Sequence, residues 1–276
     1  SAIQMATINT AEYFKIANLG AIAPGYKADM VVLPNLKDFK PSMVFKEGKL
    51  VAKDGKLIQN LDYVHIPSVR GSVNVNLDKN AFEIEAKSNS VKTINVLPHQ
   101  LITKMSVEHI KIDDNNLAQS NIADDVLKIA VIERHRASGN IGLGFVKGFG
   151  LQQGAIASTV AHDSHNMIVI GTNDEDMYYA AKELVKSQGG KIVVNNGKTL
   201  AHLPLPIAGL MSDKRLEEVI KKVNELNIAA KEIGCTINDP FMSMAFLSLS
   251  VIPELKITDK GLIDANKFEV TELFNV

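Results

Sequence analysis

The sequence predicts an α+β protein: a partial β-sandwich region followed by an α+β C-terminal domain with a mixed, largely antiparallel sheet and flanking helices. Size supports this, because 276 residues are enough for one large or two ordinary domains. Composition supports it too, since 46% hydrophobic and 22% charged residues are typical of a soluble globular chain. The third observation is order: short β-rich runs precede the helices, without strict strand–helix alternation.

The chain divides into three expected segments. Residues 1–60 are expected to hold the end of a helical element and part of the β-sandwich, and residues 61–91 a polar connecting segment. Residues 92–276 are expected to form the C-terminal α+β domain. Ser1, with or without Ala2, is interpreted as a remnant of expression cloning, so we expect the native protein to continue upstream.

In the first segment, hydrophobic spacing predicts a helix over residues 5–15, with Met5, Ile8 and Phe14 facing inward. β-rich runs bounded by glycines then predict strands. The expected strands span residues 28–33, 41–47, 49–52 and 56–58, and Asp54-Gly55 forms a hairpin turn between the last two.

In the C-terminal segment, the same criteria predict strands over residues 91–97, 127–133, 154–160, 166–170, 192–194 and 199–203. Thr172 with Glu175 forms an expected capping box that starts one helix. Ser212 is expected to cap a long helix, and Asp239 a helix that runs to residue 249.

Charge and cysteine content exclude several classes of protein. The 30 Lys and Arg residues are balanced by 31 Asp and Glu residues, so the chain has no basic field for nucleic acid. No apolar run approaches the roughly 20 residues of a membrane-spanning helix. The single cysteine, Cys235, excludes an internal disulfide framework and fits a reducing compartment. We therefore expect a cytoplasmic protein without nucleic-acid or membrane partners.

Two polar clusters follow predicted strands, at residues 133–136 and 161–166. Imidazole and carboxylate groups can bind a divalent metal or act as a general base. The catalytic candidates are His162, Asp163 and His165, and the substrate-binding or gating candidates are Glu133, His135 and Asn166. If the two strands are neighbours, both clusters reach one rim. Alternatively, these are turn residues with satisfied hydrogen bonds.

Six glycines between residues 139 and 154 separate the two clusters. The spacing of Gly142, Gly144 and Gly148 does not match a dinucleotide-binding fingerprint, and no helix pattern follows directly. We expect these glycines in bulges or at close backbone contacts.

Two sets of motifs carry a family resemblance. Residues 5–14, followed by Gly20-Ala-Ile-Ala-Pro-Gly-Tyr-Lys-Ala-Asp29, resemble the end of an amidohydrolase-superfamily enzyme, where a β-sandwich flanks the catalytic barrel. Residues 133–150, 154–166, 172–176 and 203–212 resemble the C-terminal domain of adenine deaminases. The resemblance implies hydrolysis of adenine to hypoxanthine and ammonia by a metal-bound hydroxide.

The sequence departs from the superfamily pattern at one point. Its seven histidines include no His-x-His pair, which in the superfamily begins the set of barrel metal ligands. The resemblance therefore implies a divalent transition metal, manganese or iron, in the intact parent enzyme and none in this chain. Its implied partners are adenine and a missing N-terminal barrel, with homo-oligomerisation also open, and we expect this portion to be inactive alone.

Three interpretations remain open at this stage. In the first, the turn at residues 162–166 faces the missing barrel and lines or gates its substrate pocket. In the second, the domain is a structural or oligomerisation module that takes no part in the chemistry. In the third, it is an independent metal-binding hydrolase that uses the cluster Glu133, His135, His162, Asp163 and His165.

Overall fold

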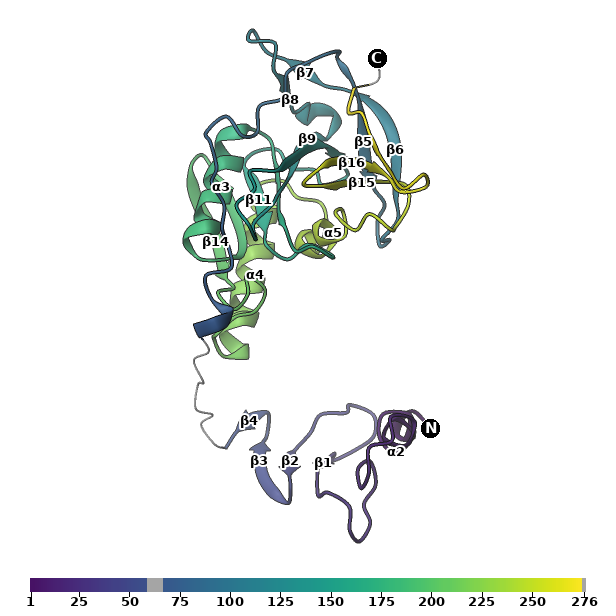
Figure 1. Ribbon diagram of the computed structural model, residues 1–276. Coiled ribbons are helices and arrows are strands. Elements are labelled where there is room, and N and C mark those ends of the chain that lie inside the picture. The colour runs from purple at the N-terminus through teal and green to yellow at the C-terminus, as the bar shows by residue number, and fades with distance from the viewer. Residues whose placement is uncertain (59–66, 275–276) are drawn as a thin grey trace. The chain divides into compact units, whose positions relative to one another are not determined.

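A computed structural model describes residues 1–58 and 67–274 of the chain (Figure 1). The chain forms two compact units, Ser1–His65 and Ile66–Val276. The boundary expected between residues 60 and 61 lies outside the described residues. Part of the expected connecting segment belongs to the core of the second unit, because Val73, Phe82 and Ile84 are buried there.

The first unit holds two short helices and one small sheet. Its helices are α1 (Ala2–Met5) and α2 (Ile8–Tyr13), and its strands are β1 (Met30–Val32), β2 (Met43–Lys46), β3 (Lys49–Lys53) and β4 (Lys56–Leu57). The four strands pair in sequence order and are antiparallel. All four expected strands are therefore confirmed, including the hairpin turn at residues 54–55.

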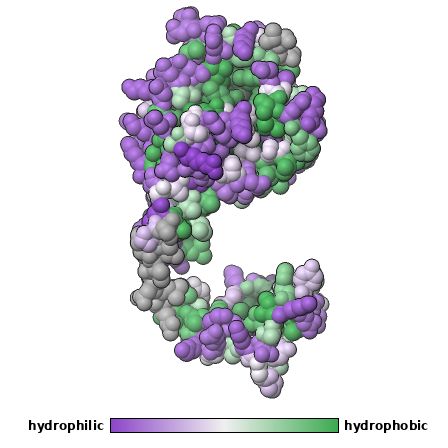
Figure 2. Space-filling view, in the orientation of Figure 1, coloured by the Kyte–Doolittle hydropathy of each residue, from purple (hydrophilic) through white to green (hydrophobic). Residues whose placement is uncertain are grey.

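The expected helix over residues 5–15 is wrong in its length and orientation. The helix is interrupted at Thr7, and Met5 and Phe14 do not face inward, since they are 67% and 66% exposed. Within residues 1–58, Ala11 is the one buried residue, because this small sheet offers the helices little surface to pack against. Figure 2 shows hydrophobic residues on the surface of this unit.

The second unit is built on an eight-stranded sheet in the order β14-β13-β11-β12-β9-β10-β5-β6. Its strands are β5 (Ser90–Val96), β6 (Thr103–His109), β9 (Val126–Ile132), β10 (Ile141–Lys147), β11 (Ala155–Ser158), β12 (Met167–Gly171), β13 (Gly190–Asn195) and β14 (Lys198–Pro204). One pair, β10 with β5, is parallel, and the other pairs are antiparallel. The mixed, largely antiparallel sheet is thus confirmed.

Both faces of this sheet are covered. Helix α3 (Asp174–Lys186) packs on one face together with residues 73–82. The other face carries α4 (Leu216–Glu232), α5 (Pro240–Ala245) and a three-stranded sheet. The smaller elements of the unit are β15 (Leu255–Thr258), β16 (Gly261–Asp264), β17 (Glu269–Thr271), β7 (Lys111–Ile112), β8 (Ala118–Gln119) and the 3-10 turns Pro67–Val69 and Ile122–Asp124. The result is an α+β layer structure, with every residue of the central strand β9 buried.

Two of the expected helix starts are wrong. Asn173 caps α3 by accepting a hydrogen bond from the Asp176 N–H at 2.8 Å, because Thr172 Oγ1 instead donates to the Gly154 carbonyl. Ser212 accepts from the Lys214 N–H, which closes a turn before α4 begins at Leu216.

The expected cap at Asp239 is confirmed, although α5 ends at Ala245 and not at residue 249. None of the helices in the described ranges, 1–58 and 67–274, is long and apolar enough to cross a membrane.

Glycines on β10 allow the hairpin of β15 and β16 to approach the large sheet. A Cβ atom on Gly142 would lie 1.8 Å from the Thr258 carbonyl oxygen, and one on Gly144 would lie 3.1 Å from Leu262 Cδ2. The expected close backbone contacts are therefore confirmed at Gly142. This approach brings the turn between β15 and β16 to the start of β10.

Gly142→Ala should lower the free energy of unfolding of the second unit by about 2 kcal/mol, because the new methyl group overpacks a rigid backbone contact. Gly144→Ala is the matched control and should cost less, since its nearest neighbour is a movable leucine side chain. Urea denaturation measures both. Equal stability of the two variants would show that the hairpin does not pack on β10 as described.

Candidate functional site

The two polar clusters meet at one rim because their strands are neighbours. β9 and β12 are antiparallel, and Ile132 at the end of β9 pairs with Met167 at the start of β12. Residues 133–138, which follow β9, and residues 162–166, which precede β12, therefore lie at the same edge of the sheet. Because the two strands are neighbours, both polar clusters lie at one rim, as predicted for that case.

Arg134 is the central connection at this rim. Its side chain is buried, and it donates to three backbone carbonyls: that of His165 from Nε, Ser72 from Nη1 and Ala208 from Nη2. Desolvation lowers the pKa of this guanidinium to about 10, so it is charged at neutral pH. A buried charge must be compensated by hydrogen bonds. Arg134 thereby fixes three chain segments to the end of β9.

The Glu133 carboxylate accepts hydrogen bonds from the backbone of its own turn. Its carboxylate accepts hydrogen bonds from the N–H groups of His135 (2.6 Å), Arg136 (3.0 Å) and Ser138 (3.0 Å). Desolvation raises the pKa of this carboxyl, but the backbone donors outweigh it and lower the pKa to about 2. Glu133 is therefore ionised at neutral pH and is not a proton donor there.

A polar pocket of about 390 Å³ opens between the two turns. It is lined by Glu133, His135, Arg136, Ser138, Asn140, Ser164, Asn166 and Asp259. The three predicted substrate-binding or gating residues are thus brought together in one pocket. His135 Nε2 lies 2.7 Å from the Ser164 carbonyl oxygen. Because a carbonyl oxygen only accepts, Nε2 carries the hydrogen in this contact.

The three predicted catalytic residues lie beside this pocket and not in its lining. The ring of His162 is 4.6 Å from the Phe246 ring and 5.5 Å from the His165 ring. Desolvation, followed by the nearby His162 and Arg134, lowers the pKa of His165, and its buried Nδ1 has no hydrogen-bond partner within the described chain. Asp163 is exposed.

The candidate residues do not form a metal site. Across residues 1–58 and 67–274, no three His, Cys, Asp or Glu side chains gather closely enough to hold a metal ion. Glu133 is moreover committed to backbone N–H groups. The described residues therefore do not fit the independent metal-binding hydrolase that was one of the three interpretations.

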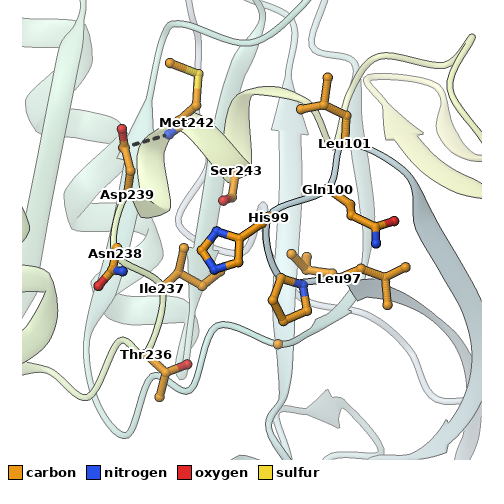
Figure 3. A pocket seen from close by; sticks show the side chains of 13 residues that line it. Leu97, His99, Gln100, Leu101, Thr236, Ile237, Asn238, Asp239, Met242 and Ser243 are labelled. Atoms are coloured by element: carbon orange, nitrogen blue, oxygen red, sulfur yellow. Dashed lines mark hydrogen bonds between the residues drawn. The ribbon is translucent and has the colours of Figure 1, made fainter.

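A second cavity, of about 370 Å³, lies between residues 96–101 and residues 236–243 (Figure 3). The His99 ring points into it, facing the segment that carries Ile237 and Asn238. Asp239 caps α5 at its edge through the Met242 N–H. This cavity is formed by different segments from the polar pocket, and sequence patterns did not indicate it.

Sequence reasoning did not name six residues of the rim as candidates: Arg134, Arg136, Ser138, Asn140, Ser164 and Asp259. Arg134 could have been found from its position, since this long cation lies two residues after a strand of seven consecutive buried residues. Asn140 and Asp259 have no comparable local signal. Asp259 lies 93 residues from Asn166, its hydrogen-bond donor, and reaches the pocket only through the packing of the β15–β16 hairpin.

Comparison with known proteins bears on the identity of this site. The model of the adenine deaminase C-terminal domain matches residues 100–269, and that of the amidohydrolase family matches residues 1–51. The chain belongs to the adenine deaminase C-terminal domain family. Both turns of the rim and Asp259 fall within the matched residues of this family.

Similar proteins cover almost the whole chain. "Adenine deaminase 2" of Carboxydothermus hydrogenoformans is 48% identical over 270 residues, which is 97% of this chain and 47% of that protein. "Adenine deaminase" of Desulfatibacillum aliphaticivorans is 48% identical over 99% of this chain and 48% of its own length. "Adenine deaminase" of Methanothrix thermoacetophila is 45% identical, again over 99% of this chain and 48% of its own length. The chain thus spans about half the length of these relatives.

Arg134→Lys should lower the free energy of unfolding by about 3 kcal/mol. A lysine cannot reach three carbonyls in a fork, and each buried acceptor left unpaired costs about 1–3 kcal/mol. Arg136→Lys, at an exposed position in the same turn, is the matched control and should change stability by less than about 0.5 kcal/mol. Denaturant titration distinguishes the two, and an unaffected Arg134→Lys variant would contradict the role given to this guanidinium.

Glu133→Gln should destabilise the domain in a pH-dependent manner. Because folding lowers the pKa of Glu133 to about 2, its stabilising contribution is present above about pH 5 and is lost as the pH falls through the folded value. The stability difference between wild type and variant should therefore shrink as the pH falls from 6 towards 2. Glu83→Gln controls for removal of an exposed carboxylate, and a pH-independent difference for Glu133→Gln would be the contrary result.

Proposed function

We propose that this chain is the C-terminal portion of an adenine deaminase, which hydrolyses adenine to hypoxanthine and ammonia. The observation that carries the proposal is the run of relatives named adenine deaminase, 45–48% identical over nearly the whole chain. The match of residues 1–51 to the amidohydrolase family supports it, because that superfamily supplies the hydrolytic barrel in the resemblance described above.

The metal of the parent enzyme, manganese or iron, is assigned to the barrel. The described residues of this chain gather no ligand set for it. The chain alone is accordingly proposed to be inactive. Uncovered hydrophobic residues on the first unit, among them Met5, Tyr13 and Phe14, support a contact between that unit and the barrel.

The polar rim is proposed to line or gate the substrate pocket. Glu133, His135 and Asn166 contribute to the pocket itself, and the turn with His162, Asp163 and His165 is proposed to face the barrel mouth. The polar pocket supports this role, since residues of both turns line one cavity of about 390 Å³, which is the size of a small-molecule site.

A purely structural role is the second candidate. It is favoured by the hydrogen bonds of Glu133 and Arg134, which go to the backbone and hold the turns in place. Ala substitutions at His162 and Asp163 in the longer protein separate the two candidates. A structural module would keep near-normal turnover, whereas a rim at the substrate would lose kcat/KM.

Composition supports the proposed cellular setting. The balanced charge and the single cysteine support a cytoplasmic enzyme without nucleic-acid or membrane partners. Self-association is proposed as a further possibility, because β6 and β14 are the two edges of the large sheet.

Ammonia release from adenine tests the proposed function. The full reading frame that encodes this chain should yield a protein that releases ammonia from adenine when supplied with manganese or ferrous iron. The 276-residue chain alone, purified in the same way, should release none above a buffer control. Turnover by the chain alone at the rate of the longer protein, or no turnover by either, would overturn the proposal.

A further inference from the structure

Strand β6 forms an edge of the large sheet that is partly uncovered. It is the last of the eight strands and, among the strands of the described chain, pairs with β5 alone (Figure 1). An edge strand presents backbone N–H and C=O groups with which another strand can pair. Met105 and Val107, which are 45% and 50% exposed, add an apolar surface to this edge. Such an edge favours pairing with a further strand.

Hydrogen bonds at the start of β6 show which of its backbone groups point away from β5. The Met105 N–H donates to Glu254 Oε2 at 3.0 Å, and the backbone of Thr103 pairs with residues 253–254. Because the direction of these groups alternates along an antiparallel strand, the N–H and C=O of Val107 also point away from β5. The edge is therefore covered as far as the Met105 N–H and open from the Met105 carbonyl onwards.

The open backbone groups are complementary to themselves about Val107. Farther along the edge, the His109 carbonyl accepts a hydrogen bond from Asn121 Nδ2 at 3.2 Å. Met105 thus offers its carbonyl, His109 its N–H, and Val107 both groups. If two β6 strands run antiparallel with Val107 opposite Val107, the Met105 carbonyl faces the His109 N–H of the other copy. The two occupied groups, the Met105 N–H and the His109 carbonyl, face each other in the same register.

The side chains of β6 agree with this register. On one face, Met105 and Val107 lie against the same residues of the other copy, so apolar surface is buried. On the other face, Glu108 lies opposite Ser106 of the other copy and diagonal to its Lys104. A register centred on Glu108 would instead place two carboxylates opposite each other, which is destabilising.

The opposite edge of the sheet, β14, is less suited to pairing. It begins with Lys198 and ends with Pro204, whose nitrogen carries no hydrogen. Lysine and proline on an edge strand discourage pairing with another chain. Of the two edges, β6 is therefore the one that fits a second copy.

We propose that β6 pairs antiparallel with β6 of a second copy of this chain, with Val107 at the two-fold axis. The two large sheets then form one continuous sheet. A two-fold contact is self-complementary, because each copy contributes the same surface. The inference specifies the edge for the self-association proposed above, and it rests on no part of the deaminase reaction.

Sedimentation equilibrium of the 276-residue chain tests this inference. The wild-type chain, of 30.0 kDa per copy, should form dimers whose fraction rises with concentration through the micromolar range. Val107→Lys should be monomeric, because it places two ammonium groups opposite each other. Leu200→Lys on β14, at a position 43% exposed, is the matched control and should dimerise like wild type. A monomeric wild-type chain, or a folded Val107→Lys variant that dimerises like wild type, would overturn the inference.

A charge exchange locates the two-fold axis. Val107→Glu should also be monomeric by itself, because two carboxylates then face each other. An equimolar mixture of the Val107→Lys and Val107→Glu variants should form a mixed dimer, because the facing charges are then opposite. If the mixture remains monomeric, Val107 does not lie opposite Val107 and the proposed register is wrong.

Disulfide formation gives a readout that does not depend on charge or on dimer affinity. Directly opposite residues of a hydrogen-bonded antiparallel pair have Cα atoms about 5.5 Å apart, within the roughly 4.4–6.8 Å that a disulfide spans. Val107→Cys in a Cys235→Ser background should therefore oxidise to a covalent dimer. Leu200→Cys in the same background is the matched control and should remain largely monomeric. Equal yields of covalent dimer from the two variants would contradict the proposed contact.

The two proposals fail in different ways. If the longer protein deaminates adenine but the Val107→Lys chain dimerises like wild type, the interface fails and the function stands. If the Val107 variants behave as expected but the longer protein releases no ammonia, the proposed reaction fails and the interface stands.

Discussion

The rim of this domain depends on one buried charge. Arg134 lies just after the end of β9, and its guanidinium donates to the carbonyls of residues 72, 165 and 208. Among the described residues no carboxylate forms an ion pair with it, although the nearby Glu133 carboxylate favours its charge, so the three carbonyl dipoles must compensate for most of the lost water. The turn before β12 therefore cannot move away without leaving a buried cation short of acceptors. The hydrogen bond from the buried guanidinium to the His165 carbonyl thereby holds this turn at the wall of the pocket.

A second constraint completes the pocket from the opposite side. The missing side chain of Gly142 lets the carbonyl of Thr258 approach β10, and the next residue in that turn is Asp259. Asp259 then receives hydrogen bonds from Asn140, just before β10, and from Asn166, just before β12. The close backbone contact at Gly142 and the two hydrogen bonds to Asp259 are thus parts of one arrangement. Glycine is unfavourable in the interior of a strand, but position 142 requires it because the β15–β16 hairpin packs against β10 there.

Much of this fold could be predicted from local pattern, and the exceptions have physical causes. The apolar runs of β9 and β12 and the turn at residues 196–197 were predictable, as was the shared rim if those strands paired. β10 was missed because Gly142 and Gly144 weaken its strand pattern. β6 was missed although its alternation of polar and apolar residues from 104 to 108 indicates a half-exposed edge strand. Asn166 was predicted at the pocket, whereas Asp259 was not, because its position depends on packing between distant segments.

The central claim is that Arg134 holds the turns of the pocket, and amide hydrogen exchange in the Arg134→Lys variant tests it most directly. The N–H of His165 donates to the Ala161 carbonyl, and that of Asn74 donates to the Arg134 carbonyl, so both report on segments fixed by the guanidinium. Exchange at residues 72–74 and 162–166 should accelerate at least tenfold in the variant, while exchange in the buried strands β9 and β11 remains slow. Unchanged exchange at both turns, or a uniform acceleration across the sheet, would contradict the claim.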